Sequence, residues 1–119
     1  MLFCMTAEYT PQALNAMREN PNTDRRAAVE QLLAAAGGKL VAMYGRAANG
    51  PGAMVIFDVP DPAMAPAVCG VAVSAGTIRN VELTGRLVGA VDLPRLLSNV
   101  GNLLHCIEAG QLDVPYGTG

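Results

Sequence analysis

The chain has 119 residues, of which 51% are hydrophobic and 15% are charged, with a formal net charge of −2. This length suits one domain, and a weakly acidic chain lacks the positive patch that nucleic acid or an anionic membrane requires, so neither is an expected partner. The apolar residues exceed what a monomer of this size buries, which predicts a homodimer or a higher even oligomer.

Secretion and membrane anchoring are not indicated by the sequence. Apolar runs near residues 53–57 and 67–73 are too short to cross a bilayer, and Met1 leads into "LFCM" without a basic leader, so we expect a cytoplasmic protein. The expected role of the cysteines is that of ordinary buried thiols, because they are widely spaced and form no CxxC pair. They are Cys4, Cys69 and Cys106.

The first part of the chain predicts a strand followed by a broken helix. "LFCMTAEY" (2–9) alternates as a strand does, and Thr10 can then cap a helix whose first residue is a proline. Pro21 interrupts that helix, because the residue before a proline avoids the helical region. A second helical segment is expected over residues 23–36, where apolar side chains recur at helical spacing until a Gly-Gly pair ends it.

The second part predicts two paired strands, a helix, a fourth strand and a last helix. "KLVAMYGR" (39–46) and "AMVIFDV" (53–59) are strands joined by a glycine-rich hairpin loop. The next helix is expected to begin near residue 65 or to have a distorted first turn, because the proline that follows would cost about 3 kcal/mol inside a regular helix. "TIRNVELTGRLV" (77–88) alternates as a strand, and a leucine-rich amphipathic helix is expected over residues 92–110.

This order of elements is a split βαβ arrangement, an α+β fold with a four-stranded antiparallel sheet, helices on one face and an extra C-terminal helix. Alternation assigns an apolar set of strand residues to the helix-covered face: Phe3, Met5, Ala7, Val55, Phe57, Val59, Val81, Leu83 and Leu87. The opposite face is mixed and measures on the order of 300–400 Å². A half-apolar face of that size usually covers a partner or a ligand.

The mixed face supplies the candidate site residues. Tyr44 and Glu82 are the candidate catalytic residues, because a phenol and a carboxylate in a semi-apolar cavity can transfer protons. On the second strand either Tyr44 and Arg46 or Met43 points to this face, since a slip of one residue exchanges the two faces of a strand. The candidate ligand-binding residues are Thr6, Arg46, Met54, Ile56, Asp58 and Arg86.

Two further features admit two interpretations each. Arg25 and Arg26, in "DRRAAVE", fit a solvated helix face, or a clamp for a carboxylate or phosphate at the mouth of a pocket. His105 is the single histidine and fits a cation near a helix C-terminus, or an axial ligand of haem. The sequence requires no cofactor and indicates no metal site other than this one.

Four stretches in chain order, "EYTPQALNAM", "GGKLVAMYG", "MVIFDVPD" and "TIRNVEL", resemble the GYD domain family of small bacterial proteins. The resemblance covers roughly residues 2–86 and implies a ferredoxin-like fold of the dimeric α+β barrel superfamily. The family's Gly-x-Tyr-Asp element corresponds to "NGPG", with Pro51 and Gly52 in place of Tyr and Asp, so no role of those two side chains carries over. We therefore divide the chain into the barrel domain (1–89), a C-terminal amphipathic helix of the same domain (90–110) and a polar tail (111–119).

The resemblance implies an architecture shared with antibiotic-biosynthesis-type monooxygenases, muconolactone-isomerase-like proteins and several haem proteins, and one fold hosts many functions. Three hypotheses stay open. The first is a homo-oligomeric barrel that binds a small, largely apolar organic molecule, with proton-transfer or cofactor-free chemistry as an option. The second is a haem-binding protein that uses His105, and the third is a ligand-free structural or assembly protein. Whether the protein is an enzyme stays open with them.

Overall fold

A computed structural model of the chain describes residues 1–46, 50–85 and 93–108. The expected α+β fold is confirmed: the strands form one antiparallel four-stranded sheet in the order β2-β3-β1-β4, and this is the strand order of a ferredoxin-like split βαβ unit. The elements are β1 (Leu2–Tyr9), α1 (Pro11–Glu19), α2 (Arg25–Ala35), β2 (Lys39–Arg46), β3 (Gly52–Asp58), α3 (Met64–Ser74), β4 (Ile78–Thr84) and α4 (Leu93–Glu108).

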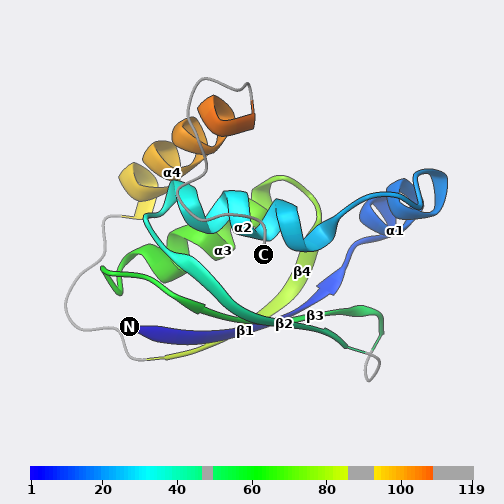
Figure 1. Ribbon diagram of the computed structural model, residues 1–119, viewed down its shortest axis with the longest axis horizontal. Helices are drawn as coiled ribbons and strands as arrows, with labels where there is room; N and C mark the ends of the chain where they lie inside the picture. Colours follow the sequence, from blue (N-terminus) through cyan, green and yellow to red (C-terminus); the bar gives the residue numbers. More distant parts are fainter. Residues whose placement is uncertain (47–49, 86–92, 109–119) are drawn as a thin grey trace.

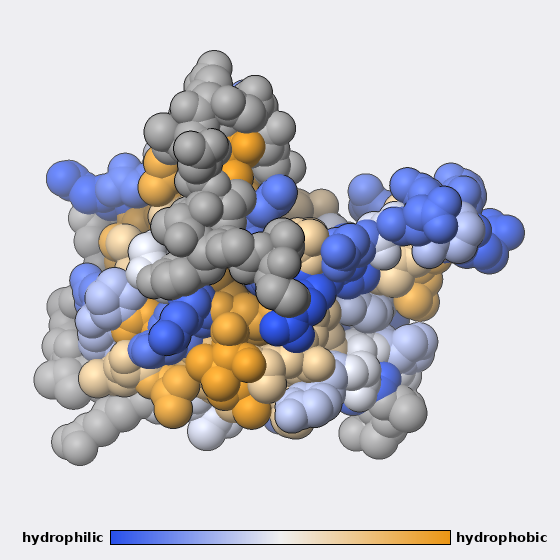
Figure 2. Space-filling model, viewed as in Figure 1, coloured by the Kyte–Doolittle hydropathy of each residue, from blue (hydrophilic) through white to orange (hydrophobic). Residues whose placement is uncertain are grey.

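The elements stack in three layers, as Figure 1 shows: the sheet, then α2 and α3 on one of its faces, then α4 on those two helices. Helix α1 projects at one end of the sheet. Hydrophilic side chains cover α1 in the same view, whereas hydrophobic side chains gather along the sheet (Figure 2). None of the described elements lies on the other face of the sheet.

The core lies between the sheet and the α2–α3 layer. Phe3 and Phe57, on neighbouring strands, stack with ring centroids 5.8 Å apart. The side chains assigned to the helix-covered face are buried in β1 and β3, and Val81 and Leu83 of β4 pack against them. Leu87, the last of that set, lies outside the described residues. Period-two alternation therefore predicted the buried face of the sheet correctly over the part of the chain that the structure describes.

The predicted broken helix is two separate helices. Helix α1 begins after Thr10, whose Oγ1 accepts a hydrogen bond from the Ala13 N–H at 3.1 Å, and α2 is capped in the same way by Asp24. Pro21 lies in the turn between them. Helix α3 begins at Met64, so Pro66 falls in its first turn, where a missing N–H leaves no helical hydrogen bond unmade.

The register of β2, which alternation left open, is set by a β-bulge. Leu40 pairs with Phe57 and Ala42 pairs with Ile56, so Val41 is an extra residue in β2. A second bulge lies in β4 at Asn80, which adopts a left-handed φ of 53°. Beyond the first bulge Tyr44 pairs with Met54, so its side chain points away from the helices.

Helix α4 packs onto its own chain. Val100 and Ile107 are buried, and Leu96 and Leu104 pack against the core cluster through α2 and α3. The leucine-rich stripe predicted from the sequence is thus covered largely by neighbouring helices of the same chain, while Leu103 remains 38% exposed. Residues 90–92 and 109–110 of the predicted helix and the predicted tail (111–119) lie outside the described residues. Over the described ranges, no helix combines the length and hydropathy that a membrane span needs.

Candidate functional site

The sheet face without helices carries most of the predicted site residues, and we call it the open face. Residues on it belong to all four strands and point away from the α2–α3 layer, as the strand pairing requires. Its members include Leu2, Cys4, Thr6, Glu8, Ala42, Tyr44, Arg46, Met54, Ile56, Asp58, Glu82 and Thr84.

A central row of four side chains crosses the open face. Tyr44 pairs with Met54, Met54 with Thr6, and Thr6 with Glu82, so the row runs from one edge of the sheet to the other. Adjacent strands are about 4.8 Å apart, which places the backbones of Tyr44 and Glu82 roughly 14 Å from each other. The two candidate catalytic residues therefore lie at opposite ends of one row, and neither can pass a proton directly to the other.

The neighbouring row supplies apolar surface. It consists of Ala42, Ile56, Cys4 and Thr84, again one residue from each strand. Three side chains at the centre of the open face are partly buried by their neighbours: Cys4, Met54 and Ile56. The larger apolar residues around them are exposed, Leu2 by 61%, Val41 by 49% and Tyr44 by 56%. The open face thus has an apolar centre with a phenol and a carboxylate at its margins.

Arg46 lies at one end of the open face, in a charged cluster around Glu8. In strand register Arg46 pairs with Gly52, Gly52 with Glu8, and Glu8 with Arg79. The bulge residue Asn80 donates a hydrogen bond of 2.6 Å to Glu8 Oε2, which also accepts from Arg79 Nε at 3.4 Å. The hydrogen bond from Asn80, together with the charges of Arg79 and Arg46, lowers the pKa of Glu8 below its usual value against the opposing effect of desolvation.

Glu8 should contribute to the pH dependence of stability. A carboxylate whose pKa is lower in the folded than in the unfolded chain stabilises the fold above the unfolded pKa, here about 4.5, and that contribution is lost as the pH falls through the folded pKa. We expect Glu8→Gln to lower the melting temperature at pH 7 and to flatten its decline below about pH 4.5. Circular dichroism melts between pH 7 and pH 3 measure both. A Glu8→Gln curve parallel to the parent curve throughout would contradict this role, and Glu19→Gln on exposed α1 is the control.

Asp58 lies at the far end of the open face and is engaged by local charges. Its carboxylate accepts a hydrogen bond from the amino group of Met1, and this contact, with the charge of the same amino group and that of Lys39, lowers the pKa of Asp58. A shallow pocket of about 300 Å³ beside it is lined by Met1, Gly37, Gly38, Lys39, Asp58 and Pro60. Asp58 therefore does not join the Tyr44–Glu82 row. Arg86, the remaining candidate ligand-binding residue, lies outside the described residues.

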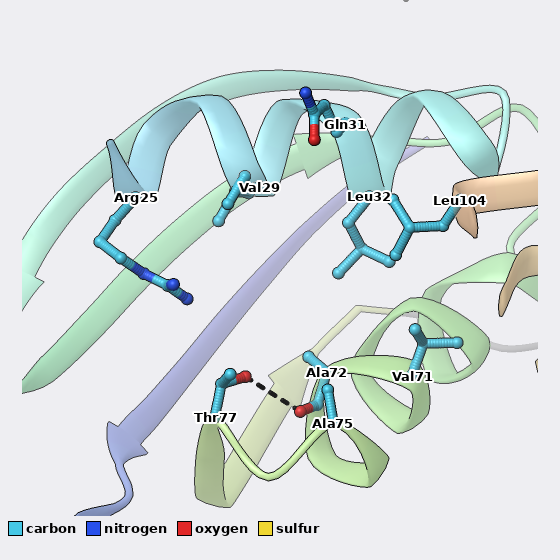
Figure 3. A pocket seen from close by; sticks show the side chains of 10 residues that line it. Arg25, Val29, Gln31, Leu32, Val71, Ala72, Ala75, Thr77 and Leu104 are labelled. Carbon is cyan, nitrogen blue, oxygen red and sulfur yellow. Dashed lines mark hydrogen bonds between the residues drawn. The ribbon is translucent and has the colours of Figure 1, made fainter. Parts of the chain in front are cut away.

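A pocket that the sequence did not indicate lies within the helical layers. It has a volume of about 220 Å³ and lies between α2, the C-terminal half of α3 and α4 (Figure 3). The Arg-Arg pair was the single sequence signal near it, since Arg25 lines the pocket. Arg26 instead donates to Glu30 Oε1 at 3.1 Å. The residues that line it are Arg25, Ala28, Val29, Gln31, Leu32, Val71, Ala72, Ala75, Thr77 and Leu104.

The histidine and cysteines occupy separate places. His105 is exposed in the last turn of α4, while its neighbour Leu104 lines the helical pocket. Cys69 is buried in α3, and desolvation raises the pKa of its thiol to about 11, so it stays protonated and unreactive at neutral pH. Cys4 lies on the open face. Within the described ranges, no three His, Cys, Asp or Glu side chains gather as metal ligands would.

The fold and the open face define a class of protein: a ferredoxin-like α+β domain in which the described helices all lie on one face of the sheet. The family model of the GYD domain matches residues 3–90. The chain belongs to the GYD domain family. No curated protein and no solved structure matched the chain in the other two comparisons.

Proposed function

We propose that this GYD-domain protein is a homodimer in which two open faces pack against each other and enclose a small, largely apolar organic molecule. The observation that carries the proposal is the arrangement of the open face, where two rows of side chains cross the sheet and place an apolar centre, Met54, Ile56 and Cys4, on its two inner strands. Sheets that pack face to face lie about 10 Å apart, so side chains of both subunits would wall a shared space.

The size of the open face sets the expected strength of the dimer. A face of roughly 300–400 Å² is about half of the ~800 Å² that each partner buries in a standard interface. The exposed side chains at its margin, Leu2 and Val41, must add to the contact. We therefore expect a dimer that dissociates in the micromolar range rather than an obligate one.

The polar groups give the enclosed space its selectivity. A pocket with an apolar wall holds its ligand in one orientation through a few polar groups, and Thr6 lies in the middle of the row between Tyr44 and Glu82. Because Tyr44 and Glu82 are about 14 Å apart in one subunit, the proposal assigns them to opposite ends of a bound molecule or to two molecules. Proton transfer, where it occurs, would use one of them at a time.

A charge placed in the centre of the open face tests the proposal. We expect sedimentation equilibrium to show a concentration-dependent dimer for the parent chain and a monomer for Ile56→Lys, because the lysine ammonium would have to be desolvated between two sheets. Asn15→Lys adds the same charge on exposed α1 and should leave the dimer intact. Circular dichroism establishes that both variants are folded.

The ligand is tested in the same samples. Indole, a small apolar probe, should shift the methyl resonances of Met54 and Ile56 in the dimeric parent chain and leave the Ile56→Lys monomer without a saturable effect at Met54. A parent chain that sediments as a monomer at about 100 µM would overturn the dimer, since the expected dissociation constant lies below that concentration. A stable dimer without any effect of indole at Met54 would favour pure assembly over binding.

A further inference from the structure

The pocket within the helical layers is distinct from the open face. None of the residues that line it belongs to the open face, and they come from α2, α3, α4 and the turn before β4. Figure 3 shows α2 on one side of the pocket and the end of α3 with Thr77 on the other, with Leu104 reaching in from α4. A ligand here would be held by one chain, whether or not the open faces pair.

The wall of this pocket is mostly apolar, with one cation and two neutral polar side chains, Gln31 and Thr77. Valine, leucine and alanine side chains from three helices form most of it: Ala28, Val29, Leu32, Val71, Ala72, Ala75 and Leu104. Among the described residues that line it, Arg25 is the one charged group. In Figure 3 its guanidinium extends from the first turn of α2 across the pocket toward Thr77. The pocket therefore combines a hydrophobic body with a positive end.

Arg25 is held in place but not satisfied. Its guanidinium carbon lies 5.7 Å from the centroid of the Tyr9 ring, an arrangement that fixes the side chain through a cation–π contact. Its Nε is buried and has no hydrogen-bond partner within the part of the chain that the structure describes. A buried donor without an acceptor is destabilising, so this guanidinium has fewer hydrogen bonds than it can make. Arg25 also lines the pocket, and a carboxylate bound there would pair with the guanidinium charge.

Thr77, a polar residue opposite Arg25, is already engaged. The Thr77 hydroxyl donates a hydrogen bond of 3.1 Å to the backbone carbonyl of Ala72, as the dashed line in Figure 3 marks. The Thr77 oxygen can therefore act only as an acceptor. It cannot donate a hydrogen bond to a carboxylate or a phosphate in the pocket. The pocket thus offers one cationic anchor and no further donor from this residue.

The volume restricts the size of the ligand. An apolar protein cavity of about 150 Å³ is large enough for benzene. The helical pocket, at about 220 Å³, has room for one six-membered ring and a carboxylate group, and it is smaller than the sites that hold drug-sized molecules. A nucleotide or a long acyl chain does not fit this space.

We propose that the helical pocket binds a small monocyclic carboxylate, with the ring against Val29, Leu32 and Val71 and the carboxylate paired with the Arg25 guanidinium. The site is a second binding site of the chain, independent of the one proposed between open faces. It also decides between the two interpretations of the Arg-Arg pair: Arg25 is the carboxylate clamp, and Arg26 is tied to Glu30 on the neighbouring face of α2.

The test compares two probes of the same shape on the full chain. Benzoate and benzamide are titrated separately while methyl NMR follows Val29, Leu32 and Val71, with Met54 on the open face as an internal reference. We expect benzoate to shift the three helical methyls saturably and to bind roughly tenfold or more tightly than benzamide, because its charged acceptor pairs with the guanidinium. Arg25→Gln should abolish that preference, and Arg18→Gln, on α1, should retain it.

Two results would overturn the proposal. One is the absence of saturable shifts with benzoate in the parent chain; the other is equal affinity for benzoate and benzamide, a comparison that needs no variant to fold. Ala72→Leu fills the pocket and should prevent both probes from binding there. This test is independent of the open-face proposal. Ile56→Lys, which should abolish the dimer, should leave the benzoate shifts at Val29 and Leu32 unchanged.

Discussion

Replacing Gly52 by alanine should destabilise the protein by about 3 kcal/mol or more, through displacement of β1 from β3. A Cβ atom at Gly52 would lie 2.0 Å from the carbonyl oxygen of Ala7 and 2.9 Å from its carbonyl carbon. These are backbone atoms of the neighbouring strand, so no side-chain rotation relieves the contact. The strands must separate where the Tyr9 N–H donates to the Pro51 carbonyl at 3.0 Å. Urea unfolding monitored by circular dichroism measures the loss.

Gly45→Ala is the matched control for this prediction. Gly45 is also a strand glycine, on the edge strand β2, and a Cβ atom there would have no heavy atom of the described residues within 4 Å beyond its chain neighbours. Alanine restricts the unfolded chain, so this variant should be as stable as the parent or more stable by up to about 1 kcal/mol. Equal stability of Gly52→Ala and Gly45→Ala would show that β1 and β3 are not held as closely as the structure has them.

The same contact bears on the expected correspondence with the Gly-x-Tyr-Asp element, in which Gly52 takes the place of the aspartate. Strand β1 approaches Gly52 too closely for any side chain. A side chain here would require the two strands to part, so the glycine is a packing requirement of this chain.

Truncating Phe57 to alanine should cost about 3–5 kcal/mol, a large part of the roughly 5–15 kcal/mol by which domains are stable. Phe57, the penultimate residue of β3, is 1% exposed and stacks on Phe3. The change removes the ring from the core and leaves a cavity that the strands cannot close, because both phenylalanines are fixed by strand pairing. The melting temperature should fall by about 10–20 °C, measured by calorimetry.

Val73→Ala is the control for Phe57→Ala, because it removes apolar atoms from the surface and not from the core. Val73 lies on α3 and is 46% exposed, so its truncation should change stability by no more than about 0.5 kcal/mol. A loss for Phe57→Ala as small as that for Val73→Ala would mean that the core is not organised around the Phe3–Phe57 stack.

The fold was largely predictable because strand and helix periods are local. Alternation identified β1 and β3 and the buried set that contains Phe3 and Phe57, and Thr10 and Pro21 marked the start of α1 and the break after it. The register of β2 was not predictable from alternation. Val41 is an extra residue in the pairing, and a bulge leaves no mark on the sequence when the residues on both sides are apolar.

The candidate site was predictable only where it depends on strand faces. Tyr44, Thr6, Met54 and Glu82 share a face because each points away from the helices, and once the register is known they form one row. Asp58 has the same orientation but lies at the end of its strand, where Met1 reaches it. The helical pocket depends on how three helices pack, and the periodicity of α2 does not encode the spacing between α2 and the other two helices.

The two bulges have a consequence for the way in which copies of this chain can meet. Both lie on the outer strands of the sheet, β2 at Val41 and β4 at Asn80, so neither border presents an uninterrupted ladder of free N–H and C=O groups. A bulge twists a border strand and puts its hydrogen-bonding groups out of phase with those of an incoming strand. Growth of the sheet into a continuous ribbon or fibre is thereby disfavoured at both sides, which agrees with the proposed association through the broad surface of the sheet.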